Sequence, residues 1–306
     1  MFLERNFFLT LFLFLAISCV PKEEPDNFIS QSIVDILSEK PTVYSEFLNA
    51  ITRLQKVETF KGAGPYTLFV PTNEALSKAG IDLKTKNVKE LETFVYHHIL
   101  GEKLYSNFIT NGKKVSLSEA NFYLHKKDSS ITINGTTAVS KIGKEAYNGI
   151  VFSVNIPLTI PTNTLEFFLE NNPDFTEIKT LIYSANTSII DVLKNSNTKG
   201  VTVFLPNNDA MNNYYKLNQK SFLLAPANKD FLNKLLLNHI VEGRYFTSDM
   251  STSSTAVIPF LAGGSLSFLS KSTLKNTKTA DISTIKLGDF QATNGIVHVI
   301  DKVLGI

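Results

Sequence analysis

The pattern of hydrophobic and polar positions predicts the same helix twice. In residues 91–99, apolar side chains recur at spacings 0, 3, 4 and 8, and a histidine, His98, stands at spacing 7. Residues 232–240 repeat the pattern, with His239 in the matching place. Such spacing puts all five side chains on one face of a helix. We therefore expect two amphipathic helices, each with a histidine on its apolar face.

A short apolar stretch precedes each of these helices. The stretches are TLFVP at residues 67–71 and TVFLP at 202–206. Each is rich in β-forming residues and is stopped by proline, which predicts a short buried strand. The polar TNEA and NNDA that follow predict helix starts, because Thr, Asn and Asp side chains accept hydrogen bonds from the free N–H groups there.

The last part of each half predicts strands. NGIVFSVN at 148–155 and NGIVHVID at 294–301 carry β-branched residues on both faces, the pattern of a strand buried on both sides. Alternating stretches at 129–140 and 263–272 precede them. These stretches predict hairpins, and Asn134-Gly135 is a good turn signal.

The blocks occur twice in the same order. EKPTVYSEFLNAI at 39–51 also has a counterpart, NNPDFTEIKTLI at 171–182. Four matched blocks in register indicate an internal repeat. Helices dominate the first part of each half and strands the second, which predicts an α+β fold. We predict two domains, residues 29–159 and 162–306, joined by the proline-bearing IPLTIPTN at 156–163.

Three of the blocks, TLFVPTNEA, HIVEG and NGIVHVIDKVL, resemble the motifs of the fasciclin (FAS1) domain family. The resemblance extends over nearly all of both halves, and the first copy departs from it at Phe152, Ser153 and Asn155. It implies, for each half, a FAS1-like domain: a wedge-shaped β-sandwich with helices packed at one edge. Family members are mostly extracellular or anchored adhesion and matrix proteins, and the resemblance implies no cofactor.

Composition agrees with two globular domains. The chain has 306 residues, of which 43% are hydrophobic and 19% charged. This balance is typical of folded rather than disordered chains. The formal net charge is +2, and no dense run of Lys and Arg occurs. We therefore expect no nucleic-acid partner.

The chain opens with a leader pattern. Residues 7–17 are almost entirely apolar and follow a short positively charged region. Eleven helical residues are too few to cross a hydrocarbon core about 30 Å thick. We therefore predict a signal peptide over residues 1–18 rather than a membrane span.

The end of the leader contains the only cysteine of the sequence, Cys19. LAISC resembles the cleavage box of bacterial lipoproteins, which implies a lipid on Cys19 and a polar tether over 19–28. The KEE within the tether looks like the acidic signal that directs some outer-membrane lipoproteins to the cell surface. The predicted location is therefore the bacterial cell envelope, on the outer membrane and facing outward. The alternative is ordinary secretory cleavage near Ser18, which leaves a free thiol.

The sequence carries no strong catalytic signature. It lacks G-x-S-x-G, H-E-x-x-H and G-x-x-x-x-G-K-[ST]. His239, His298 and Asp301 belong to one domain, so a metal or proton-transfer site is one hypothesis. The other is imidazoles bonded to backbone carbonyls, and it is favoured because Phe152 takes the place of His298 in the first half. We predict structural roles for His298 and Asp301, no catalytic residue and no metal.

A Tyr-His dipeptide on the middle helix contributes to integrin binding in some animal fasciclin domains. Here Tyr96-His97 lies one residue out of register, because His98 matches the family histidine. In the second copy, Asn238 precedes His239. We keep these five residues as candidate binding residues.

Three functions remain open from sequence. The first is a non-enzymatic surface lipoprotein whose two fasciclin domains mediate adhesion or bind a protein or glycan. The second is an accessory lipoprotein subunit of an outer-membrane complex. The third, with the least support, is a hydrolase. The first two share attachment to the membrane through an N-terminal lipid.

Overall fold

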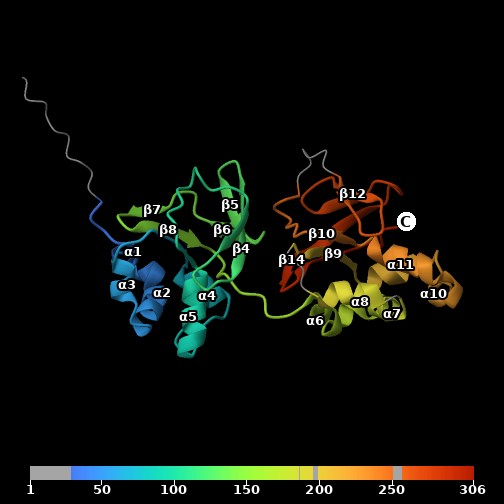
Figure 1. The fold of residues 1–306 in the computed structure, drawn as a ribbon, viewed down its shortest axis with the longest axis horizontal. Helices are drawn as coiled ribbons and strands as arrows, with labels where there is room; N and C mark the ends of the chain where they lie inside the picture. Colours follow the sequence, from blue (N-terminus) through green and yellow to red (C-terminus); the bar gives the residue numbers. More distant parts are fainter. Residues whose placement is uncertain (1–28, 186, 196–198, 251–256) are drawn as a thin grey trace, which may run out of the picture.

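The computed structural model describes residues 29–306 except 186, 196–198 and 251–256. Two domains lie side by side, each with its helices on one side and its strands on the other (Figure 1). The predicted signal peptide, Cys19 and the tether lie outside the described residues. No helix among the described residues is both long and apolar enough to span a membrane.

Three helices of the first domain start at side-chain caps, of which only the one at Thr72 was predicted from sequence. Ser32 and Asn87 each form a capping box, and the Thr72 side chain accepts the Ala75 N–H. The helices are α1 (Ile33–Ser38), α2 (Pro41–Arg53), α3 (Val57–Lys61), α4 (Asn73–Lys78) and α5 (Val88–His97). The strands are β1 (Tyr66–Pro71), β2 (Ile99–Leu100), β3 (Gly112–Val115), β4 (Asn121–Lys127), β5 (Ser130–Ile133), β6 (Thr137–Val139), β7 (Lys144–Ala146) and β8 (Gly149–Val154).

The second domain repeats this plan. Its helices are α6 (Leu165–Glu170), α7 (Thr176–Ser184), α8 (Thr187–Lys194), α9 (Asn208–Tyr215), α10 (Lys220–Leu224) and α11 (Lys229–Leu237), with 3-10 turns η1 (Pro173–Phe175) and η2 (Pro226–Asn228). Its strands are β9 (Val201–Pro206), β10 (Ile240–Glu242), β11 (Ile258–Pro259), β12 (Ser265–Phe268), β13 (Thr273–Asn276), β14 (Ile282–Ala292) and β15 (Gly295–Ile300). The α+β class predicted from sequence is confirmed.

Each domain holds one sheet that bends back on itself. The strand order is β2-β1-β8-β6-β5-β4-β3 in the first domain, with β7 also pairing β8, and β10-β9-β15-β14-β13-β12-β11 in the second. In the first domain the Leu117 N–H, after β3, donates to the Ile99 carbonyl in β2, so the barrel-like sheet is nearly closed. The two layers of the predicted sandwich are thus parts of one hydrogen-bonded path.

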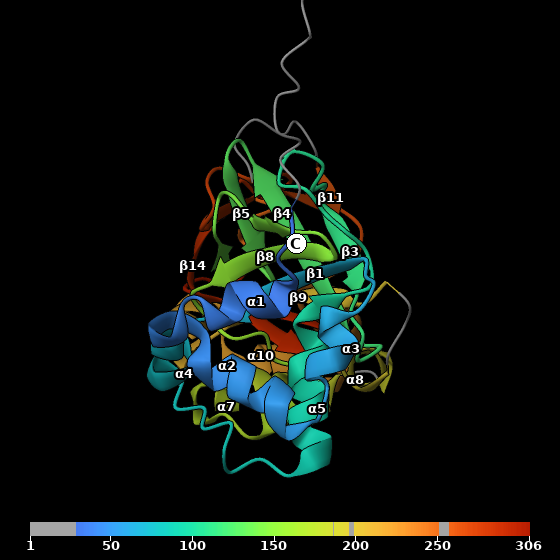
Figure 2. The same cartoon turned by 90° about the vertical axis from the view of Figure 1, so that its left-hand side faces the viewer.

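The repeated strands lie side by side, second and third in the strand order of each sheet, where β1 runs parallel to β8 and β9 parallel to β15. Leu68 and Val70 of β1 face the helices, whereas Phe69 faces the inside of the bent sheet. Figure 2 shows the helices of the first domain beneath this sheet. Two apolar cores per domain explain why these strands are buried on both faces, as predicted.

The middle helices end earlier than the sequence pattern predicts. α5 ends at His97 and α11 at Leu237, and Ile99 and Ile240 begin strands instead. The reason is tertiary: the carbonyl of His98 accepts the N–H of Phe69 at 2.9 Å, and the second domain repeats this bond. The chain therefore leaves the helix to join the edge of the sheet.

The domains touch through β4 and the segment after β10. The Tyr123 ring lies 5.6 Å from that of Phe246, and the Arg244 guanidinium lies 5.9 Å from the centre of the Tyr123 ring. His125 Nδ1 lies 2.8 Å from Asp249 Oδ1. Burial at this contact raises the pKa of Asp249.

Candidate binding grooves beside the middle helices

His98 and His239, two of the candidate binding residues, make the same internal link in both domains. In the first, His98 Nδ1 bonds the Phe94 carbonyl at 2.8 Å, and Nε2 accepts the Leu158 N–H at 2.9 Å. In the second, His239 bonds the Leu235 carbonyl at 2.8 Å and accepts the Leu304 N–H at 2.9 Å. Each ring therefore ties the end of the helix to the segment after the last strand.

Both linking imidazoles are neutral. Each donates from Nδ1 to a carbonyl and accepts at Nε2, which only the neutral ring can do. Burial lowers the pKa of His98 to about 3 and that of His239 to about 4, because a charged imidazole inside the core would lose its hydration. Neither ring nitrogen is left for a ligand.

The asparagine of each NGIV block is a second internal link, which the sequence did not reveal. Asn148 Oδ1 accepts the N–H of Ile33, and its Nδ2 donates to the Phe60 and Gly62 carbonyls, all at 2.8–2.9 Å. Asn294 accepts the N–H of Leu165 at 2.9 Å and donates to the Leu193 carbonyl at 2.7 Å. The last strand is thereby joined to the first helices.

His298, predicted to be structural, lies on the inner face of β15 and is fully buried. Its Nε2 donates to the Tyr245 carbonyl at 2.7 Å, and its Nδ1 accepts the Asp289 N–H at 3.2 Å. Burial lowers its pKa. Among the described residues, no group of three His, Cys, Asp or Glu side chains could hold a metal ion.

Asp301 and its counterpart Asn155 each accept a hydrogen bond from a backbone N–H of a neighbouring strand. Asp301 Oδ1 accepts the Thr284 N–H at 2.7 Å, and Asn155 Oδ1 accepts the Ala138 N–H at 2.7 Å. Burial alone would raise the pKa of Asp301, but the hydrogen bond from Thr284 and the ammonium of Lys286 outweigh it, and the pKa is lowered. The side chain is a backbone acceptor at the end of the strand.

A groove lies beside α5 in the first domain, where the candidate residue His97 is found. We call it the first groove; its volume is about 360 Å³. Its walls are mainly apolar and come from one face of α5, the loop before it and the segment after β8, with Ile81, Phe94, Leu158 and Ile160 among them. Lys86 and Lys89 also line it. Tyr96 belongs to a different face of the helix and packs against Phe60, with ring centres 6.2 Å apart.

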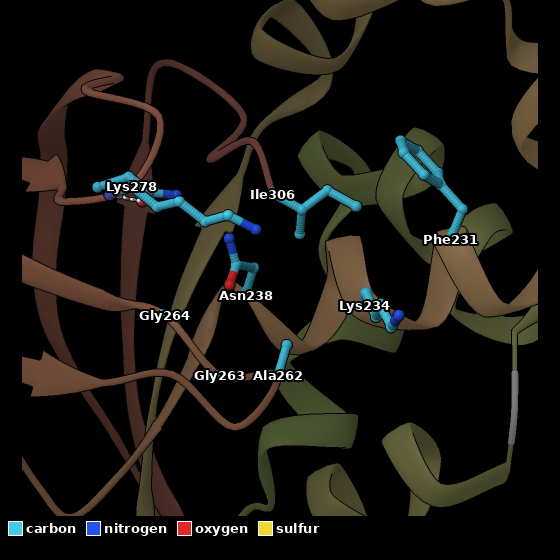
Figure 3. A pocket seen from close by; sticks show the side chains of 9 residues that line it. Phe231, Lys234, Asn238, Ala262, Gly263, Gly264, Lys278 and Ile306 are labelled. Carbon is cyan, nitrogen blue, oxygen red and sulfur yellow. Dashed lines mark hydrogen bonds between the residues drawn. The ribbon is translucent and has the colours of Figure 1, made fainter.

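The second domain has a groove in the equivalent place, of about 550 Å³, with different chemistry. Figure 3 shows this second groove between α11, the glycine turn before β12 and the end of the chain. Its lining is more polar and includes Lys234 and Lys278, with Asn238 at the position that His97 holds in the first domain. The Asn238 amide donates to the Gly305 carbonyl. His98 and His239 thus make the same bonds in the two domains, whereas the residues that line the two grooves differ.

Comparison with known proteins agrees with the repeated fold. The family model described as "Fasciclin domain" matches residues 42–161 and 173–306. The chain belongs to the fasciclin domain family. The predicted family membership is therefore confirmed.

Relatives of this fasciclin chain are found in animals, in a plant and in a bacterium. Pig transforming growth factor-beta-induced protein ig-h3 is 25% identical over 256 residues, which is 80% of this chain and 35% of that protein. Human periostin is 22% identical over 285 residues, 92% of this chain and 31% of periostin. Protein sll1483 of Synechocystis sp. is 37% identical over 103 residues, 34% of this chain and 53% of that protein. The chain thus spans about a third of the first two relatives.

Among solved structures, a FAS1 domain pair from the insect cell adhesion molecule fasciclin I is similar to this chain. The sequence identity is 17% and the TM-score is 0.43. The match covers 85% of this chain and 96% of the insect chain.

Proposed function

We propose that this fasciclin-domain protein is a non-enzymatic adhesion or binding protein of the bacterial cell surface. A lipid on Cys19 would hold it at the outer membrane, and the two domains would meet a protein or glycan ligand. The family supports the binding role, and the insect relative is named as a cell adhesion molecule. The lipid anchor rests on the leader sequence, LAISC followed by a polar segment.

One observation carries the proposal. The polar side chains that the two domains share are occupied by internal hydrogen bonds, as His98, His239, Asn148 and Asn294 show. What differs between the domains is the lining of the two grooves. A scaffold with fixed internal links and variable grooves is suited to binding rather than to a shared reaction, because function resides in sites placed on a fold.

The test is binding by the full chain, purified in mild detergent and coupled to beads through a C-terminal tag. Beads are mixed with intact cells and with envelope fragments, and a matrix of the same detergent without protein is the control. We expect saturable retention of cells or of one envelope component. Co-purification only with a fixed membrane complex would support the accessory-subunit alternative, and the absence of any saturable ligand would contradict the adhesion proposal.

A further inference from the structure

One residue that lines the first groove, His97, has a buried ring nitrogen with no partner. His97 is 1% exposed, and its Nε2 has no hydrogen-bond partner in the described structure. The Ser116 and Ser118 hydroxyls lie 3.1 and 3.3 Å from Nδ1, and a hydroxyl can donate or accept, so Nδ1 has a partner in either neutral tautomer. Nε2 has no partner in either tautomer, and a donor brought by an occupant would select the one in which Nε2 accepts.

Such an atom is costly in a folded protein. A buried polar atom that lacks a partner destabilises the fold, because its hydrogen bond to water is lost and not replaced. The second domain avoids this cost at the same position, because the Asn238 amide donates to the Gly305 carbonyl. Burial also lowers the pKa of His97 to about 4, so the ring stays neutral near neutral pH and Nε2 can accept a hydrogen bond. The comparison shows that the nitrogen without a partner is particular to the first domain.

The rest of the groove sets two further requirements for an occupant. Its walls are mainly apolar, so the body of the occupant has to be apolar. Lys86 and Lys89 line it and have no ion-pair partner among the residues that the structure describes. Glu90 also lines it and keeps its negative charge, although its carboxylate accepts the Asn87 N–H at 3.2 Å as part of the helix cap. The two lysines outnumber this one glutamate, so the net charge of the groove is positive.

We propose that the first groove receives a tyrosine or tryptophan side chain of a protein partner, from a segment that carries acidic residues beside it. Tyrosine and tryptophan combine an apolar ring with one polar donor, and they are the common anchors of protein interfaces. The O–H or indole N–H reaches Nε2 of His97, the ring packs between Phe94 and Ile160, and the flanking acids meet the lysines. This inference rests on the proposed function and names the class of partner for one of its two grooves.

The experiment uses the full chain in detergent with ¹⁵N-labelled histidine and three synthetic peptides that differ only at the centre or its flanks: Asp-Tyr-Asp, Asp-Phe-Asp and Lys-Tyr-Lys. We expect the first peptide to bind about tenfold more tightly than the second, which lacks the donor, and to shift the His97 Nε2 resonance. We also expect weaker binding of the third. Equal binding of Asp-Tyr-Asp and Asp-Phe-Asp, or shifts confined to the second domain, would overturn the proposal.

Two sets of variants complete the test. His97→Asn installs the residue of the second domain, and Lys86→Glu with Lys89→Glu reverses the charge at the groove; each should weaken Asp-Tyr-Asp binding by about tenfold or more. Lys113→Glu with Lys127→Glu makes the same charge change on exposed positions of β3 and β4, outside both grooves, and should leave binding unchanged. Retention of cells by variants that no longer bind the peptide would leave the proposed function intact and refute the groove assignment. Peptide binding by the full chain without any retention of cells or envelope would support the groove assignment and contradict the proposed adhesion function.

Discussion

The imidazole of His298 stacks on the ring of Phe204, with centres 5.5 Å apart and planes 24° apart. In the first domain, Phe152 stacks on Phe69 in the same way, with 5.6 Å and 18°. One aromatic position is therefore filled by histidine in one copy and by phenylalanine in the other. Only the histidine has hydrogen bonds to the surrounding backbone.

This equivalence predicts that His298→Phe is tolerated. The ring fits the position, but the Tyr245 carbonyl and the Asp289 N–H lose their partner, so the free energy of unfolding should fall by about 1–3 kcal/mol. His298→Ala also leaves a cavity and should lose roughly as much again or more. Denaturant melts of both variants check the order. Unchanged stability with ligand binding lost in both would instead make His298 a binding residue.

Stability should fall as the solution becomes acidic. His97, His98 and His239 have pKa values of about 4, 3 and 4 in the folded chain, below the ordinary value of 6.5. Between pH 6.5 and about 4 the unfolded state binds protons that the folded state does not, so acid favours unfolding. Each histidine should contribute a slope of about 1.4 kcal/mol per pH unit in that window.

Urea melts at several pH values between 7 and 4.5 measure this slope. The pKa of His298 is also lowered by burial, so four histidines contribute to the slope. His97→Asn removes one of them and places there the residue found in the second domain, so it should reduce the histidine contribution to the slope by about a quarter. A free energy of unfolding that stays constant across the window would show that these rings are charged in the folded state.

Membrane attachment should depend on Cys19. We expect Cys19→Ala to abolish metabolic labelling with palmitate and to release the protein from the membrane fraction, because the thiol is the predicted lipid acceptor. Cys19→Ser serves as a closer control for size and polarity. A variant that remains in the membrane fraction without label would point to an uncleaved leader as the anchor.

The second domain should fold without the first. Its two apolar cores are built only from residues between Leu165 and Leu304. The fragment 162–306 loses the contacts of Tyr123 and His125 across the interface, so we expect a modest loss of stability but a single cooperative transition. Thermal and urea melts of the fragment test this. A broad transition would show that the domains share one cooperative unit.

The pattern of hydrophobic and polar residues predicted those elements that depend on residues close together in the chain. The buried strand at Phe69, the hairpin at Asn134-Gly135 and the repeat itself follow from alternation, turn residues and block order. The links of Asn148 could not be predicted, because its amide donates to the carbonyl of Phe60, 88 residues away. The early end of α5 has the same origin, since the carbonyl of His98 pairs with the sheet.

The candidate site was likewise predictable only where it depends on residues close together in the chain. The sequence drew attention to the histidines of the middle helices and matched His98 to the family histidine, but it could not show which of the two is bonded internally at both nitrogens and which lines a groove. That distinction needs the positions of Leu158, whose N–H donates to His98, and of Ser116, which faces His97. The apolar lining of the first groove also comes from segments far apart in the chain, such as Ile81 and Ile160.

The central claim is that the family histidine holds the fold and its neighbour serves the groove. The most direct measurement is amide hydrogen exchange at Leu158, combined with cell retention, in two variants of the full chain, His98→Gln and His97→Asn. We expect His98→Gln to lose protection at Leu158 by more than tenfold, because the bond to Nε2 is broken. We expect His97→Asn to keep that protection and to lose retention. Protection kept in His98→Gln, or retention kept in His97→Asn, would contradict the account.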